Sequence, residues 1–132
     1  MDIKIELVIL PVTDVDRAKA FYVDQVGFHA DFDQRVNENL RFVQLTPAGS
    51  ACSIAFGEGL TDAAPGSVKG LQAVVADADE AHAELTAKGV PVTDVDDLAW
   101  GRFVISPTRT GTPGRCSRCP SGRTAVSGRS PR

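Results

Sequence analysis

The sequence of 132 residues has few of the residue types that mark metal, redox or disulfide chemistry: two histidines, three cysteines, one tryptophan and one tyrosine. An odd number of cysteines does not predict a disulfide framework. No apolar run approaches the roughly 18–20 residues that a membrane span needs. The first ten residues contain acids and no cleavage site of small residues, so no secretory signal is predicted. We therefore expect a cytoplasmic protein with no membrane partner.

Acidic residues are missing from the last part of the chain. All 17 acids and 8 of the 14 basic residues lie within residues 1–105, whereas the six basic residues of 106–132 are all arginine. The acidic body argues against binding to a phosphate backbone. The arginines of the tail have no interleaved aromatic residues, which argues against single-stranded nucleic acid as well. No nucleic-acid partner is expected.

Apolar patterns and turn signals predict the same order of elements twice. Strands are expected at 3–12, 28–35, 40–46 and 51–57, with a helix from Thr13 or Asp14 to Gly27. After a polar linker at 59–69, a strand is expected at 70–76, a helix from Asp77 to Gly89, and strands from 90–92 and at 100–105. The segments VTDVDRA (12–18) and VADADEA (75–81) share valine, two aspartates and alanine. This spacing indicates an internal duplication of a βαβββ module and an α+β fold.

Residues 106–132 have a different character, because Ser, Thr, Pro, Gly, Arg and Cys make up nearly all of this tail. No strand or helix period is found there. We therefore predict that the second module lacks its last strand.

The residues of 3–105 resemble a known family. The segments LVILPVTDVDRAKAFYVDQVGF, RFVQLTPAGSACSIAFGEGL, APGSVKGLQAVVADADEAHAELTAKGV and WGRFV are similar to the glyoxalase I/bleomycin-resistance/extradiol-dioxygenase group, the vicinal oxygen chelate superfamily. The resemblance implies one domain at 1–105 with module 1 at about 3–58 and module 2 at about 70–105. It also implies a homodimer with pockets at module or subunit interfaces. One fold hosts many functions, so the resemblance is less specific for activity.

Members of this family introduce their last strand with a D-P-D-G-N turn, which the sequence lacks. Residues Ile105–Pro120 can be encoded by GC-rich codons. If each new codon starts at the third base of the old one, the shifted frame can encode the peptide LADPDGNAWAVQQVP. We therefore hypothesise that residues 106–132 are a frameshift product that replaces the last strand. The alternative is a genuine disordered basic tail.

The resemblance also assigns the positions of a metal site. In metal-dependent members, the first and last strands of each module supply the ligands, usually His and Glu. The His positions fall five residues before the valine of the V-x-D motif, at Leu7 and Gly70, and the Glu position of module 1 falls at Ser53 or Ala55. None of these side chains is a credible ligand for a divalent ion, although a shift of one register reaches Glu6, Leu71 or Gln72.

Other candidate ligands are isolated in the sequence. His29 and His82 are each expected to be an ordinary surface or packing histidine. The pair Cys116 and Cys119 has zinc-like spacing but no second pair. No metal or other cofactor is expected, and no catalytic residue is assigned.

What remains is a mostly apolar cup with sparse polar groups, which suits a small organic ligand. Trp100 could stack on a planar ligand or belong to the core, and Arg102 could neutralise an anionic group or pair with a surface acid. The candidate lining residues are Phe42, Gln44, Ser53, Ala55, Trp100 and Arg102.

Three functions follow from these expectations. The leading one is metal-free binding of a small organic ligand, as in the drug-sequestering bleomycin-resistance branch. The competing one is a metal-dependent lyase, isomerase or dioxygenase, which would need a divalent metal. The third is a remnant without function, because a missing last strand would open the cup.

Overall fold

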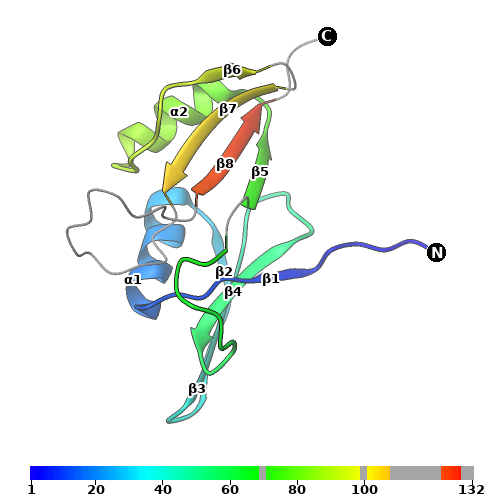
Figure 1. Cartoon of the computed structure of the whole chain (residues 1–132), viewed down its shortest axis with the longest axis vertical. Coiled ribbons are helices and arrows are strands. Elements are labelled where there is room, and N and C mark those ends of the chain that lie inside the picture. Colours follow the sequence, from blue (N-terminus) through cyan, green and yellow to red (C-terminus); the bar gives the residue numbers. More distant parts are fainter. Residues whose placement is uncertain (69–70, 99–100, 108–122, 129–132) are drawn as a thin grey trace.

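The computed structural model describes residues 1–68, 71–98, 101–107 and 123–128, and for the last three strands it describes the backbone (Figure 1). In each half of the chain, one strand precedes a helical segment and three strands follow it. In chain order the elements are β1 (Leu7–Ile9), α1 (Val15–Ala20), the π-helix η1 (Phe21–Val26), β2 (His29–Asn37), β3 (Leu40–Thr46), β4 (Ser53–Glu58), β5 (Leu71–Val75), α2 (Ala78–Ala87), β6 (Asp96–Leu98), β7 (Gly101–Pro107) and β8 (Arg123–Gly128).

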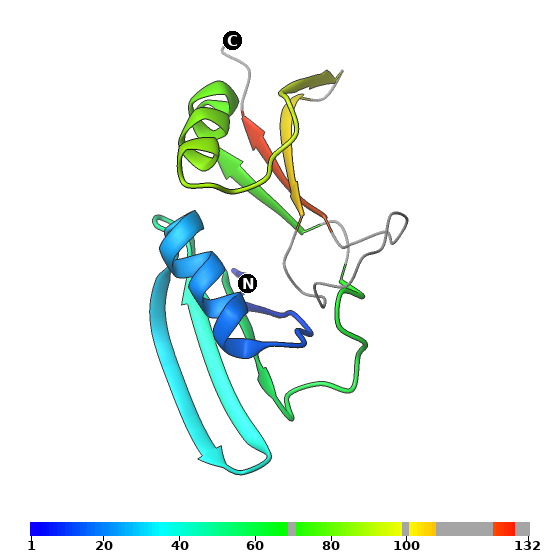
Figure 2. The same cartoon turned by 90° about the vertical axis from the view of Figure 1, so that its left-hand side faces the viewer.

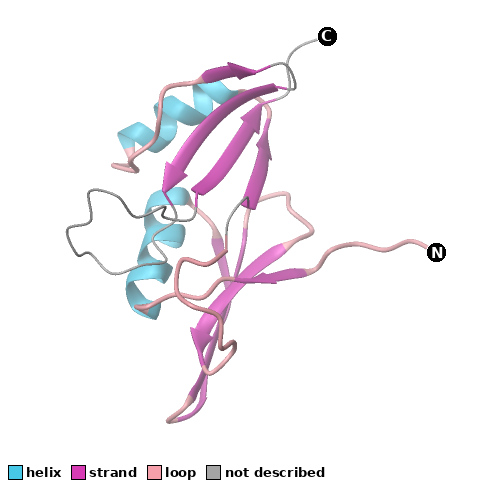
Figure 3. Cartoon of the chain, viewed as in Figure 1, coloured by secondary structure: helices cyan, strands magenta, loops and turns pink. Residues whose placement is uncertain are grey.

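The two halves form sheets of the same topology, with strand orders β1-β4-β3-β2 and β5-β8-β7-β6. In each sheet the first strand runs parallel to the last strand of its module, and the other pairs are antiparallel. Figure 2 shows the two modules stacked, and Figure 3 shows the helix that accompanies each sheet. The α+β fold with paired βαβββ modules is therefore confirmed.

The prediction that the second module lacks its last strand is wrong. Residues 123–128 form β8, which pairs with β5 from Leu71↔Thr124 to Val75↔Gly128 and with β7 on its other side. Without it, β5 and β7 would each expose a row of unpaired backbone groups. Its only ordinary apolar residues are Ala125 and Val126, so backbone pairing rather than an apolar pattern defines this strand. Residues 108–122, with Cys116 and Cys119, lie outside the described residues.

The predicted helix boundaries are confirmed by their caps. The Asp14 carboxylate accepts a hydrogen bond from the Arg17 backbone N–H at 3.0 Å, and Asp77 accepts from Asp79 and Glu80 at the start of α2. Side-chain acceptors of this kind satisfy backbone N–H groups that have no partner within the helix. η1 ends at Gly27, whose φ of 92° lies in the left-handed region that favours glycine.

The strand expected from residue 90 is absent, and β6 begins only at Asp96. The backbone N–H of Gly89 donates to Thr86 at 3.0 Å, and that of Val90 donates to Leu85 at 2.9 Å. This pair of bonds is a Schellman motif, which ends α2 and brings the residue after the glycine back onto the helix. Val90 is therefore a buried cap residue instead of a strand residue.

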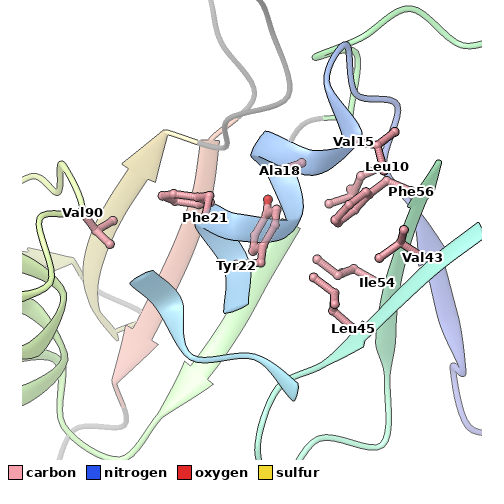
Figure 4. Packing of buried hydrophobic residues seen from close by; sticks show 10 residues of the cluster. All are labelled: Leu10, Val15, Ala18, Phe21, Tyr22, Val43, Leu45, Ile54, Phe56 and Val90. Atoms are coloured by element: carbon pink, nitrogen blue, oxygen red, sulfur yellow. The ribbon is translucent and has the colours of Figure 1, made fainter. Parts of the chain in front are cut away.

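One hydrophobic core joins the modules. Its centre is formed by α1, η1, β3 and β4, and Val90 of module 2 belongs to the same cluster (Figure 4). The ends of η1 and α2 also meet, because a Cβ on Gly27 would lie 3.6 Å from Lys88 Nζ. Within the described part of the chain, no helix has the length and apolar character needed to cross a bilayer.

Candidate functional site

One face of the first sheet carries the residues that the sequence predicts as pocket lining. Gln44 pairs with Ala55, Phe42 with Gly57, and Leu7 with Ser53. Register partners in a sheet share a face, so the predicted residues of module 1 lie together, opposite the core face of Val43, Leu45, Ile54 and Phe56. We call this surface the cup face, and its members are Leu7, Ile9, Phe32, Phe42, Gln44, Thr46, Ser53 and Ala55.

The expected metal positions of module 1 meet on the cup face, but their side chains do not form a metal site. Leu7 lies beside Ser53, and Ala55 lies beside Ile9. Leucine and alanine carry no donor atom, and a neutral serine hydroxyl alone is a weak ligand for a divalent ion. Among the described residues, no group of three or more His, Cys, Asp or Glu could hold a metal ion. The residues present therefore do not fit the metal of the metal-dependent members.

A chain of hydrogen bonds crosses the cup face from β3 to β2. Ser53 is the buried polar residue of the described chain, with 6% of its surface exposed. Its hydroxyl lies 2.6 Å from that of Thr46 and accepts a hydrogen bond from Gln44 Nε2 at 3.3 Å. Thr46 in turn donates to the Asp31 carboxylate. We call Gln44, Ser53, Thr46 and Asp31 the polar chain.

A β-bulge brings Asp31 into the polar chain. The register of β2 and β3 shifts between Ala30, which pairs with Leu45, and Phe32, which pairs with Gln44. The shift leaves Asp31 as the extra residue of β2, and such bulges re-aim side chains. The sequence did not point to Asp31, whose place in the polar chain depends on the bulge, and Thr46 was not among the predicted lining residues.

A second polar group lies between α1 and the strands β2 and β3. Arg41 Nε and Nη2 each donate to Asp33 at 3.0 Å, Lys19 Nζ donates to it at 2.8 Å, and Arg41 also reaches Asp16 at 2.9 Å. The hydrogen bonds from Arg41 and then Lys19 hold the pKa of Asp33 well below its ordinary value. The bonds to Asp33 and Asp16 raise the pKa of Arg41. This group ties α1 to the hairpin that carries the polar chain.

A cavity of about 400 Å³ lies where module 1 meets β5. Of the predicted lining residues with described side chains, Ser53 borders this cavity, whereas Phe42, Gln44 and Ala55 do not. Most of the wall is apolar or backbone, from the β3–β4 turn, the start of β4, η1 and β5. The lining consists of Val8, Tyr22, Phe28, Pro47–Ser50, Cys52–Ile54 and Leu71–Val74.

Tyr22 connects the cavity wall to the core. Its ring is stacked on Phe28 with centroids 5.4 Å apart and meets Phe21 edge-on at 5.1 Å. Within the described part of the chain, its buried hydroxyl has no hydrogen-bond partner. Burial raises the pKa of Tyr22 to about 12.

Two predicted site residues and one predicted metal position remain without a described side chain. Trp100 and Gly70 lie outside the described residues. Arg102 lies in β7, where its backbone pairs with Asp97 and Gly128. Their contribution to a pocket stays a prediction.

The fold agrees with comparisons to known proteins. A family model described as glyoxalase superfamily protein matches residues 2–109. TnmS3, an antibiotic binding protein from Streptomyces sp. CB03234, is 29% identical, with a TM-score of 0.80 over 98% of this chain and 99% of its own. No curated protein sequence matches the chain.

Two further solved structures are similar along nearly the whole chain. A glyoxalase/bleomycin resistance protein from the same Streptomyces strain is 28% identical, with a TM-score of 0.74 over 94% of this chain and 99% of its own. A glyoxalase/bleomycin resistance protein/dioxygenase superfamily member from Sphaerobacter thermophilus is 25% identical, with a TM-score of 0.77 over 97% and 98%. The family model covers most of the chain, and the chain therefore belongs to the glyoxalase superfamily.

Proposed function

We propose that the protein binds a small organic molecule and sequesters it without a metal and without breaking a bond. The observation that carries this proposal is the cavity of about 400 Å³ with its mostly apolar wall and few polar groups, which is the usual character of a small-molecule site. The similarity to TnmS3, an antibiotic binding protein, supports the same class of function.

The residues that line the cavity suit a flat apolar ligand. Phe28, a half-buried ring that stacks on the buried Tyr22, offers an aromatic surface, and Ser53 is one of the polar residues of the wall. A micromolar dissociation constant corresponds to about 8 kcal/mol. Burial of roughly 300 Å² of apolar surface, from ligand and wall together, supplies that amount before the cost of association is subtracted.

We also propose that the protein is a homodimer in which a second copy helps to cover the cup face. The supporting observation is the exposure of large apolar side chains there: Phe32, which pairs with Gln44, is 57% exposed, and Ile9 is 39% exposed. These side chains lie at the two opposite edges of one sheet face, and exposed apolar groups on one face are typical of an interaction surface. Light scattering after size-exclusion chromatography is expected to give the mass of a dimer, and a monomer at all concentrations would contradict this proposal.

The binding proposal is tested with 2-naphthylmethanol, a neutral aromatic probe. We expect its titration into labelled protein to shift the amide NMR signals of Tyr22, Phe28, Ser53 and Leu71. The variant Ala48→Trp, at an exposed position on the cavity rim, is expected to block these shifts. The control variant Ala83→Trp adds the same bulk to an exposed position of α2 and should leave them unchanged. Absence of saturable shifts in the unaltered protein would overturn the proposal.

A further inference from the structure

The hydrogen-bond directions along the polar chain follow from its last member. The ionised Asp31 carboxylate has no proton to give, so Thr46 donates its one hydroxyl hydrogen to Asp31. In the contact with Ser53, Thr46 must then accept, and Ser53 donates. With its hydrogen used, Ser53 accepts from Gln44 Nε2. Every bond of the chain therefore points from Gln44 toward Asp31.

This direction determines how Gln44 presents its amide. If the amide were turned over, its oxygen would face the Ser53 oxygen with no hydrogen between them. Among the described residues, no group donates to Gln44 Oε1, which is an acceptor on the cup face. One N–H of the Gln44 amide also remains, and the other outward group of the chain is the Asp31 carboxylate.

The charge of Asp31 is balanced differently from that of its neighbour Asp33. Asp33 is held by Arg41 and Lys19 on the helix side of the hairpin. Among the described residues, the ion pair of Asp31 is with His29 Nε2 at 3.9 Å, and this histidine side chain is 78% exposed. The Asp31 side chain itself is 25% exposed, so a ligand group can reach it.

The bulge that admits Asp31 also places an aromatic ring on the cup face. Phe32 pairs with Gln44 across β2 and β3, and 57% of its surface is exposed. A carboxylate, a carbonyl oxygen and an exposed aromatic ring are each favourable neighbours for a cation with N–H groups.

We propose that the cup face recognises the ammonium group of an apolar amine, with Asp31 and Gln44 Oε1 as acceptors and Phe32 as the adjacent ring. The inference rests on the proposed binding function and names its ligand class. Ser53 connects the two, because its hydroxyl belongs to the polar chain and the residue is one of those that line the cavity. The ammonium group of the ligand then lies at the polar chain, whose member Ser53 borders the cavity.

The test compares two probes of the same shape at pH 7: 2-naphthylmethylamine, which is protonated, and 2-naphthylmethanol, which is neutral. We expect the unaltered protein to bind the amine about tenfold more tightly by NMR titration, as a charge-assisted hydrogen bond provides. Asp31→Asn is expected to remove this preference, so that the two probes bind with similar affinity. The matched control Asp24→Asn removes the same charge from an exposed position of η1 and should keep the preference.

A second variant, Thr46→Val, keeps the branched side chain but breaks the polar chain, and we expect it to reduce the preference as well. Equal affinity of the two probes for the unaltered protein, or a preference that survives Asp31→Asn, would overturn the inference while the binding function stands. If neither probe binds, the binding function itself fails, and the inference fails with it.

Discussion

Leu7 and Ser53 are register partners in the parallel pair of β1 and β4, so an apolar side chain lies beside the hydroxyl that belongs to the polar chain. The family resemblance assigns Leu7, and either Ser53 or Ala55, to metal ligands, and here these side chains provide one neutral oxygen. We predict that protein purified without chelator carries less than about a tenth of an equivalent of divalent metal, and that added metal leaves its melting temperature unchanged. Mass spectrometry of metal content and thermal unfolding measure this. Near-stoichiometric metal with marked stabilisation would favour the lyase or dioxygenase instead.

Tyr22→Phe is predicted to leave stability unchanged or to raise it by up to about 1 kcal/mol, because the hydroxyl is buried without a described partner. Urea unfolding measures the difference. A loss of more than about 1 kcal/mol would show that the hydroxyl makes a bond in solution.

The ionisation of Tyr22 gives a second, independent check. Burial raises its pKa from 10.0 to about 12, so the stability linked to this group is full below pH 10 and is lost as the pH rises from 10 toward 12. Tyr22 is the single tyrosine of the chain, so ultraviolet absorbance reports it directly. A midpoint near 10 in the folded protein would contradict the burial.

Asp33→Asn is predicted to lower stability by about 1 kcal/mol at pH 7, since the Asp33 side chain is 27% exposed and its ion pairs are partly screened. The pKa of Asp33 is lowered from an ordinary value of 3.8. Its stabilising contribution is therefore present above about pH 4 and is lost as the pH falls further. Urea unfolding at pH 7 and pH 3 should show the difference between the two proteins shrinking at pH 3. A difference that is the same at both values would refute the assignment, and Asp24→Asn serves as the charge-matched control.

A truncation after Pro107 removes β8 and is predicted to expose the facing edges of β5 and β7. Hydrogen exchange should then show loss of amide protection across module 2, with module 1 still protected. A truncation after Gly128 keeps β8 and is the control. Unchanged protection in β5 after the shorter truncation would mean that β8 contributes nothing to the sheet.

The frameshift hypothesis concerns the origin of residues 106–132 and is tested at the level of nucleotides. We predict that the codons of Ile105–Pro120 encode the D-P-D-G-N turn in the alternative frame. Synonymous bases that do not encode it would leave the basic tail as a genuine sequence.

Much of module 1 could be predicted because its signals are local. The strand at 40–46 alternates between core and cup face and matches β3, and Asp14, Asp77, Gly27 and Gly89 mark helix ends by their own chemistry. Val90 was predicted as a strand residue because an apolar residue after a glycine fits both a strand and a helix cap. β8 was missed because it is defined by partners that are distant in sequence.

Local sequence signals likewise predict only part of the candidate site. Alternation placed Phe42 and Gln44 on one face, the family resemblance added Ser53 and Ala55, and the observed register places all four together. Alternation could not find Asp31, whose place depends on a bulge, nor the contribution of β5 to the cavity, which depends on how the modules meet.

The closing strand of each sheet is the last strand of its module in sequence, and this has a consequence for synthesis on the ribosome. The first sheet is complete once Glu58 has been made, but the second waits for Gly128. Until then β5 and β7 lack the strand that lies between them, and exposed edges of this kind invite wrong pairing. A nascent chain therefore has a long interval in which one half can be folded while the other depends on residues still to be translated.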